Sequence, residues 1–243
     1  MLTATLLTAA LVVAGCSDGG KSFPDIAASG APDAPEQHVP VLAVFDEGVD
    51  LAQIPIADLP DPEWVGATSA DHGIPARAVA AYAGAAIRVS VTSPDCGLGW
   101  NTLAGIGAVE SFHGRYGDSD IEPDGLVDPP VIGIPLDGGP GVAEISDTDG
   151  GDMDGDDEWD RAVGPMQFIP ETWSWIGQDG NMDGVADPHH IDDAALSAAA
   201  LLCHTGGEII SDEGWNTAVM GYNQSVAYAR EVAEYATQYW AET

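Results

Sequence analysis

Residues 98–109 contain no charged side chain, although 40 of the 243 residues of the chain are Asp or Glu. This apolar run predicts a helix, and it ends at Glu110, directly before Ser111. Burial next to apolar residues would raise the pKa of a glutamate, which a general acid working near neutral pH requires. A glutamate that ends a helix in contact with solvent fits the same pattern. Residues 98–111 alone therefore leave both interpretations open.

The remainder of the chain also favours helices. Pro75 precedes an Ala-rich run, as expected at a helix start. Asp192 and Asp193 suit the positive end of a helix, and apolar residues after Ser225 follow helical spacing. The helices that we expect cover residues 75–89, 98–113, 165–175, 192–204, 214–222 and 225–240. The predicted fold class is mainly α, with long irregular loops, chiefly residues 117–161.

The charge of the chain limits its partners. Forty acidic residues face only 6 Lys and Arg, which gives a formal net charge of −34. This balance argues against nucleic acid and anionic lipid, because phosphate groups are bound through clustered Lys and Arg. An anionic polymer would have to be held by hydrogen bonds and stacking. Self-repulsion of such a surface is relieved by salt, so we interpret it as an adaptation to a saline or cation-rich exterior.

The N-terminus predicts export. Residues 2–15 are small and apolar, and Val13-Ala14-Gly15-Cys16 resembles the lipobox of bacterial lipoproteins. Residues 1–16 would then be a signal peptide that is too short to span a bilayer permanently, and Cys16 would be acylated. This predicts a location in the cell envelope, anchored by lipid alone to the outer face of a bacterial membrane. A plain secretion signal is the alternative; no Lys or Arg precedes the apolar stretch, so Met1 need not be the true start.

The composition changes along the chain. Residues 17–71 are rich in Asp, Ala, Pro and Gly, show little periodicity, and predict an acidic tether. A strand at the apolar residues 39–45 that lies against the domain is the alternative for that part. The folded domain is expected to cover residues 72–243. The two remaining cysteines, Cys96 and Cys203, predict a disulfide in an exported protein. Two free buried thiols are the alternative.

Four ordered segments carry a family resemblance. They are residues 96–100 (CGLGW), 104–114 (AGIGAVESFHG), 162–173 (AVGPMQFIPETW) and 221–228 (GYNQSVAY). Together they resemble the membrane-bound type B lytic murein transglycosylases of the lysozyme-like superfamily, over about residues 72–240. The resemblance implies a lysozyme-like helical domain. It also implies cleavage of the β-1,4 bond between N-acetylmuramic acid and N-acetylglucosamine in peptidoglycan, leaving 1,6-anhydromuramoyl ends.

The resemblance also assigns roles to residues. Glu110 would be the sole catalytic acid and base, assisted by the N-acetyl group of the substrate as an exception to the two-carboxylate scheme. Ser111 would hydrogen-bond the substrate near that acetamido group; a helix cap or a contact with solvent is its alternative role. Met166 and Gln167 would line subsites on a helix, with a place in the core as the alternative for Met166. Tyr222 and Asn223 match a late Tyr-Asn pair, whose Tyr hydroxyl is expected near the catalytic Glu. For Tyr222 and Asn223, packing under a turn and capping of the last helix is the structural alternative.

Two other functions fit the same residues. A hydrolytic muramidase would need a second carboxylate, for which Asp160 and Glu171 are distant candidates. A calcium-stabilised lipoprotein that binds the cell wall without cleaving it is the alternative from another class. The presence of Glu110, Gln167 and Tyr222 weighs against that second alternative.

One acidic loop resembles half of an EF-hand. Oxygen donors occupy the first, third, fifth and ninth positions, Gly184 the sixth, and the seventh supplies a backbone carbonyl. These donors are Asp179, Asn181, Asp183, Val185 and Asp187. The twelfth position is His190 instead of Glu, but in type B transglycosylases a longer loop ends at the fifteenth position, which here is Asp193. We therefore expect a structural Ca²⁺, with a solvated acidic turn as the alternative, and no organic cofactor.

Two further patterns are weaker. The acidic residues between Asp147 and Asp157 lack a convincing last ligand, and we expect a solvated loop, with a second cation as the alternative. His189 and His190 suggest zinc, but no third ligand accompanies them, so surface histidines are the simpler interpretation.

Overall fold

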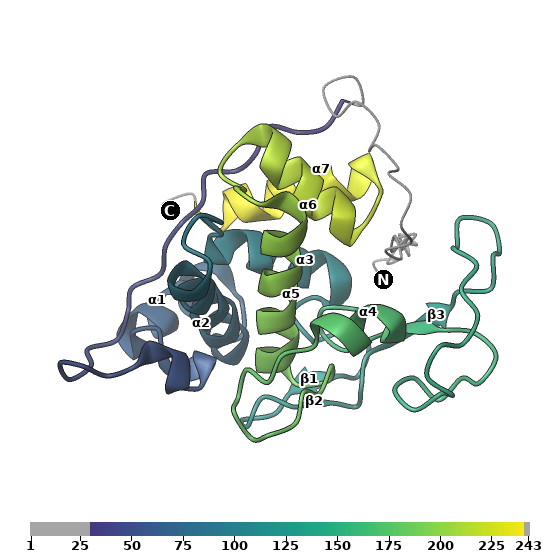
Figure 1. The fold of residues 1–243 in the computed structure, drawn as a ribbon, viewed down its shortest axis with the longest axis horizontal. Coiled ribbons are helices and arrows are strands. Elements are labelled where there is room, and N and C mark those ends of the chain that lie inside the picture. Colours follow the sequence, from purple (N-terminus) through teal and green to yellow (C-terminus); the bar gives the residue numbers. More distant parts are fainter. Residues whose placement is uncertain (1–29, 241–243) are drawn as a thin grey trace.

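The computed structural model describes residues 30–240, so the predicted signal peptide and Cys16 lie outside the described residues. The fold is mainly helical, as predicted (Figure 1). The helices are α1 Pro62–His72, α2 Ala76–Thr92, α3 Trp100–Ser111, α4 Pro170–Ile176, α5 Ile191–Gly206, α6 Asp212–Tyr222 and α7 Val226–Gln238, with 3-10 turns η2 Leu51–Gln53 and η3 Ile56–Asp58. Within residues 30–240, no helix is long and apolar enough to cross a membrane.

Helix α3 lies in the core, as its lack of charge predicts. Its residues from Trp100 to Ala108 are all buried, and it packs against α7 and α2. Gly107 allows the closest of these contacts, because a Cβ at this position would lie 2.0 Å from the Tyr82 hydroxyl on α2. The apolar run therefore forms a helix that is surrounded by other helices, with Glu110 in its last turn.

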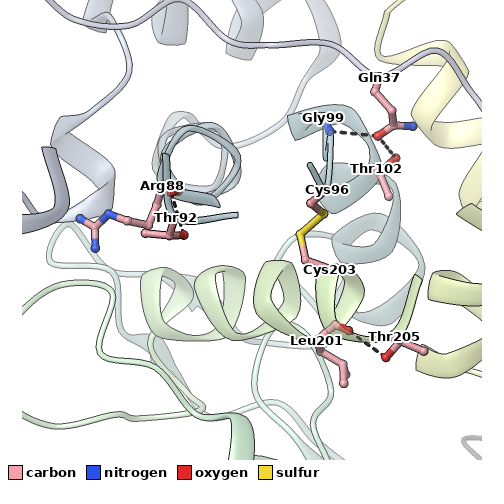
Figure 2. Close-up of a disulfide and its surroundings, with 9 residues drawn as sticks. All are labelled: Gln37, Arg88, Thr92, Cys96, Gly99, Thr102, Leu201, Cys203 and Thr205. Carbon is pink, nitrogen blue, oxygen red and sulfur yellow. Dashed lines mark hydrogen bonds between the residues drawn. A yellow bond between two sulfur atoms is a disulfide. The ribbon is translucent and has the colours of Figure 1, made fainter. Parts of the chain in front are cut away.

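The disulfide prediction is confirmed. Cys96, in the segment before α3, is bonded to Cys203 in the last turns of α5 (Figure 2). Helix α5 runs through the centre of the molecule and packs against α2 and α6 (Figure 1). The disulfide therefore fastens the start of the Glu110 helix to the central helix.

The prediction that residues 17–71 form a tether is wrong for its described part. Ile56 and Leu59 are completely buried, and Val65 of α1 also joins the core. Gly84 of α2 admits the backbone of Ile56 so closely that a Cβ would lie 1.8 Å from the Ile56 carbonyl oxygen. The folded domain therefore begins well before residue 72.

Residues 30–43, named here the N-terminal strap, cross the helices in an extended conformation (Figure 1). The Gln37 side-chain oxygen accepts hydrogen bonds from Gly99 N and Thr102 Oγ1, both 2.9 Å long. Asn101 Nδ2 donates to the Glu36 carbonyl at 2.9 Å. Backbone and side-chain hydrogen bonds thus bind the strap to the first turn of α3. Hydrogen bonds of this kind require no periodic pattern of hydrophobic residues, so the sequence does not reveal them.

Two small antiparallel sheets lie between α3 and α5 in the chain. Strand β1 Asp120–Ile121 pairs with β2 Val127–Asp128, and β3 Ile132–Pro135 pairs with β4 Arg161–Val163. Residues 136–160 form a long acidic insert between β3 and β4. A tight turn follows β4, and α4 begins only at Pro170. The helix expected over residues 165–175 is therefore wrong in its first half, because the carbonyl and N–H of Val163 pair with Phe168 across the turn.

Candidate active site

Glu110 has the surroundings of a carboxyl group that keeps its proton. It is partly exposed at the surface, although protein atoms surround its carboxyl closely on most sides. Burial raises the pKa of Glu110 to about 8; the hydrogen bond from Tyr228 opposes this rise, and the nearby Glu231 adds to it. A carboxylic acid with this pKa is protonated at neutral pH and still borders solvent. It can therefore give a proton to a bound molecule.

The hydroxyl of Tyr228, on α7, donates a hydrogen bond of 2.6 Å to Oε1 of Glu110. Tyr228 is 4% exposed, and burial together with the Glu110 charge raises its own pKa well above the usual range. The phenol is therefore a permanent hydrogen-bond donor. The tyrosine that contacts Glu110 is therefore Tyr228 and not Tyr222, the residue that the family resemblance implies. The signal was present, because Tyr228 ends the GYNQSVAY segment and follows the Ser225 cap by three residues.

Tyr222 lies nearby but uses its hydroxyl elsewhere. Its hydroxyl donates a 2.6 Å hydrogen bond to the carbonyl of Met166. Asn223 is completely buried, follows the end of α6, and accepts a hydrogen bond from Ser225 N. The predicted pair therefore joins α6 to the turn after β4. For Tyr222 this arrangement matches the alternative of packing under a turn, whereas the expected cap of the last helix is Ser225 and not Asn223.

The turn after β4 is fixed to the Glu110 helix. Ser111 Oγ donates a 2.6 Å hydrogen bond to the Pro165 carbonyl and accepts one of 2.7 Å from Gly114 N. Met166 is completely buried, and Gln167 is 9% exposed with its amide donating to the Gly164 carbonyl at 3.0 Å. The residues predicted to line the substrate site are thus close to Glu110 but buried. Their contact with a substrate stays a prediction.

The chain reverses sharply after α3. Phe112 and His113 both have left-handed backbones, with φ values of 53° and 62°. The buried His113 ring lies between two hydroxyls, 3.4 Å from that of Tyr82 and 3.0 Å from that of Tyr239. Burial lowers the pKa of His113 to about 3, so this ring is neutral. A network of neutral groups therefore holds the end of α3 in place.

The predicted calcium loop is organised around Asp193. The carboxylate of Asp193 is completely buried and accepts hydrogen bonds from the backbone N–H groups of Gly180, Asn181 and Asp187. Burial raises the pKa of Asp193 to about 6. Asp179 Oδ2 accepts from Gly184 N at 2.8 Å, whereas its Oδ1 is buried without a partner.

Of the other loop donors, Asp183 and Val185 are exposed, and Asn181 and Asp187 are half-buried. Asn181 and Asp183 hydrogen-bond each other, and Asp183 accepts from Val185 N. The two histidines within the loop do not converge. His189 Nε2 donates to the Met153 carbonyl and His190 Nε2 to the Asp124 carbonyl, so both serve loop contacts.

Three carboxylates in the described residues do lie within reach of a single ion. Oxygens of Asp147, Asp149 and Asp160 lie within 4.8 Å of one another, in the acidic insert. Both oxygens of the buried Asp160 already accept hydrogen bonds from Thr148, and Asp147 accepts from three backbone N–H groups. Loop hydrogen bonds thus account for this cluster.

Two cavities lie away from Glu110. One of about 700 Å³ is bounded by the end of α2, the disulfide and α5, and includes Arg88, Gln178 and His204 in its wall. The other, of about 570 Å³, lies beside the Arg77–Asp192 ion pair. Neither of these two cavities includes Glu110 in its wall. The chemistry of the carboxyl group marks it as the candidate.

No family model, no curated protein and no solved structure matches this chain. Its function must therefore be argued from the residues around Glu110.

Proposed function

We propose that this protein is a lytic transglycosylase that cleaves the β-1,4 bond between N-acetylmuramic acid and N-acetylglucosamine of peptidoglycan. One observation carries the proposal. Glu110 ends a charge-free buried helix, borders solvent, has a pKa of about 8, and is held by the Tyr228 hydroxyl at 2.6 Å. These are the properties of a general acid prepared for work near neutral pH. The four sequence segments that resemble the type B family favour this reaction and a lysozyme-like arrangement of the helices.

The proposed reaction uses Glu110 twice. Its carboxyl group gives a proton to the glycosidic oxygen while the bond between that oxygen and C1 of the muramic residue breaks. The acetamido oxygen of the same sugar supports the positive charge that develops at C1. The Glu110 carboxylate then takes the proton of the C6 hydroxyl, whose oxygen bonds to C1 and closes the 1,6-anhydro ring. Because the Tyr228 hydrogen bond engages Oε1, the second oxygen, Oε2, is the one that carries the transferred proton.

The surrounding residues keep the geometry fixed. Ser111 and Tyr222 each donate to a carbonyl of the turn after β4, at Pro165 and Met166. This turn therefore cannot move without breaking buried hydrogen bonds to α3 and α6. Rigid positioning of this kind favours attack by an intramolecular hydroxyl over attack by water.

We also propose that residues 179–193 bind a structural Ca²⁺. The buried Asp179 Oδ1 has no hydrogen-bond partner, and a carboxylate oxygen in that state is costly unless it is paired or coordinates a cation. Asp179, Asn181, Asp183, Asp187, Asp193 and the Val185 carbonyl would hold the ion. The ion would fasten this loop to the start of α5. Asp193 already links the two, because it lies in the first turn of α5 and accepts hydrogen bonds from backbone N–H groups of the loop.

The N-terminal sequence also supports a cellular location for the reaction. A lipid anchor at Cys16 would hold the enzyme at the outer face of a bacterial membrane, close to the wall. Peptidoglycan glycan strands would be its partner. The net charge of −34 makes nucleic acid an unsuitable one.

A hydrolytic muramidase is the second candidate, and one observation favours it. Glu231, on the same helix as Tyr228, is near enough for its charge to raise the pKa of Glu110. It would be the second carboxylate of a two-carboxylate mechanism. Asp160 is less suited, because Thr148 occupies both of its oxygens, and Glu171 is exposed on α4. A protein that binds the cell wall without cleaving it is the third candidate.

Mass spectrometry of muropeptides released from purified peptidoglycan distinguishes the three. The full chain is used, with Ca²⁺ and with a chelator, next to the variants Glu110→Gln and Glu234→Gln. Products ending in 1,6-anhydromuramic acid, absent only with Glu110→Gln, would support the transglycosylase. Products with reducing ends would identify a muramidase, and wall binding without products would leave a binding protein.

A further inference from the structure

Phe112 stands directly after the helix that carries Glu110, and its side chain serves the fold poorly. The residue is 57% exposed, so most of its ring gains nothing from burial. Its backbone is left-handed, with a φ of 53°, while its N–H closes the end of α3 on the Ala108 and Gly107 carbonyls. Glycine is the usual residue at this position of a helix end, because a Cβ makes the left-handed backbone unfavourable.

The left-handed backbone of Phe112 therefore lowers the stability of the folded chain relative to glycine, and the largely exposed ring recovers little of that loss through burial. A residue that costs stability in the fold is retained where another requirement outweighs that cost, and such residues cluster at functional sites. The exposed aromatic ring is the only part of Phe112 that a glycine would lack. The requirement must therefore concern the ring.

The ring is well placed to meet a glycan. Phe112 follows Glu110 by two residues, so their Cα atoms lie at most about 7.6 Å apart. A sugar chain whose scissile bond lies at Glu110 extends over this distance on either side. Tyr116, four residues further along the chain, is a second exposed aromatic residue, with 47% of its surface accessible.

The chemistry of the chain also calls for such a contact. The net charge is −34, so attraction between charges does not hold an anionic polymer on this surface. The flat apolar face of a sugar ring offers an alternative, because aromatic rings provide large, stiff contact areas. We propose that Phe112 is a sugar-stacking residue that holds a peptidoglycan glycan strand beside Glu110. This inference rests on the proposed function.

The test compares three substitutions in the Glu110→Gln background, which under the proposed function should bind glycan without cutting it. Glycan strands freed of peptide by an amidase are the probe, and calorimetry measures their dissociation constant. Phe112→Gly is expected to weaken binding about tenfold, the equivalent of about 1.4 kcal/mol. It is also expected to raise the melting temperature by about 2–4 °C. Phe112→Tyr should leave both quantities unchanged, and so should Trp175→Phe, since Trp175 is an exposed aromatic on α4.

Two results would overturn the inference while the proposed function stands. One is unchanged binding by Phe112→Gly together with normal muropeptide release by the same variant in the Glu110 background. The other is a drop in melting temperature, which would show that the fold needs the ring. If the unsubstituted protein neither binds nor cleaves these strands, the proposed function fails, and the role of Phe112 fails with it.

Discussion

The hydroxyl of Tyr228 lies 2.6 Å from Oε1 of Glu110, although 118 residues separate the two in the chain. The contact exists because α7 packs along α3, where Gly105 lets the two backbones approach: a Cβ at Gly105 would lie 2.8 Å from the Val232 carbonyl oxygen. A phenol that always donates favours the ionised form of its partner. It therefore limits how far burial raises the pKa of Glu110.

Removing this hydroxyl should change the pH dependence of the reaction. In Tyr228→Phe the pKa of Glu110 should rise above about 8, so the alkaline limb of the kcat/KM profile should move to higher pH. The rate itself should fall about 10- to 100-fold, because the carboxyl group loses the contact that orients it. Rates of glycan cleavage from pH 5 to pH 10 measure both effects. Tyr235→Phe, on the same helix, is the control, and an unmoved alkaline limb in Tyr228→Phe would contradict the assignment.

Glu110 should also cost stability at neutral and alkaline pH. Its pKa is about 8 in the folded protein, whereas an ordinary glutamate has a pKa near 4.5. Between these two values the folded protein keeps a proton that the unfolded chain releases, so the free energy of unfolding falls as pH rises through this window. Below pH 4.5 both states hold the proton, and the penalty is absent.

Glu110→Gln removes this penalty. We expect its free energy of unfolding to exceed that of the unsubstituted protein by about 1–2 kcal/mol at pH 8, reduced from the full shift because Glu110 is partly exposed. At pH 4 the difference should disappear. Denaturant unfolding at the two pH values measures it, with the exposed Glu234→Gln as control. A difference that does not depend on pH would mean that the pKa of Glu110 is ordinary.

Truncation should show which part of the N-terminal region the folded domain needs. A chain starting at residue 73 lacks Ile56 and Leu59, both completely buried, and leaves cavities beside α2. Losing two such side chains costs about 2–5 kcal/mol each, a large part of the stability of a typical domain. We expect this chain to be unfolded or aggregated, and a chain starting at residue 30 to melt cooperatively. Circular dichroism melts compare them; equal melting temperatures would restore the tether interpretation.

The helices that the sequence predicts correctly are those with a local sequence pattern. The expected helices over residues 98–113, 192–204 and 225–240 correspond to α3, α5 and α7, because each depends on composition and spacing within one segment. The strap and η3 could not be predicted in this way. Their contacts, such as Gln37 with Gly99, join residues that are distant in sequence and require no periodic pattern.

The candidate site divides in the same way. Glu110 was accessible to sequence reasoning because the apolar run on its N-terminal side implies burial. The sequence did not indicate that Tyr228 rather than Tyr222 contacts Glu110. That choice depends on how α6 and α7 pack beyond the turn at Asn223. The buried state of Ser111 and Gln167 likewise follows from the turn after β4, where the sequence suggested a helix.

Calcium should stabilise the protein through the loop that contains Asp179. At a hundredfold excess over its dissociation constant, an ion that binds only the folded state adds about 2.7 kcal/mol, or about 5–10 °C in melting temperature. Asp179→Asn should abolish the gain, because it removes the unpaired buried carboxylate oxygen. Asp147→Asn, in the acidic insert, should keep it. Melting curves with Ca²⁺ and with a chelator measure the gain. If both variants lose the stabilisation by Ca²⁺ equally, or if Ca²⁺ does not stabilise the unsubstituted protein, the loop is not the calcium site.

Salt should stabilise the protein for a reason that is independent of calcium. Each arginine in residues 30–240 is held by a partner within the fold. The partners are Asp192 for Arg77, the Leu51 and Ile54 carbonyls for Arg88, the Phe112 and Gly73 carbonyls for Arg115, Asp156 for Arg161 and the Gly30 carbonyl for Arg230. These few arginines are far outnumbered by the acidic groups of the chain, which therefore repel one another with little compensation.

Raising KCl from about 0.02 M to about 1 M shortens the Debye length to about 3 Å and should screen this repulsion. We expect the melting temperature at pH 7.5 to rise steadily with KCl, in the presence of a chelator that excludes the calcium loop from the effect. The control is the same titration near pH 4.1, the isoelectric point of the sequence, where the net repulsion is absent. There the dependence on KCl should be weak. A similar rise at both pH values would assign the effect to the general action of salt on apolar burial, and the acidic surface would then need another explanation.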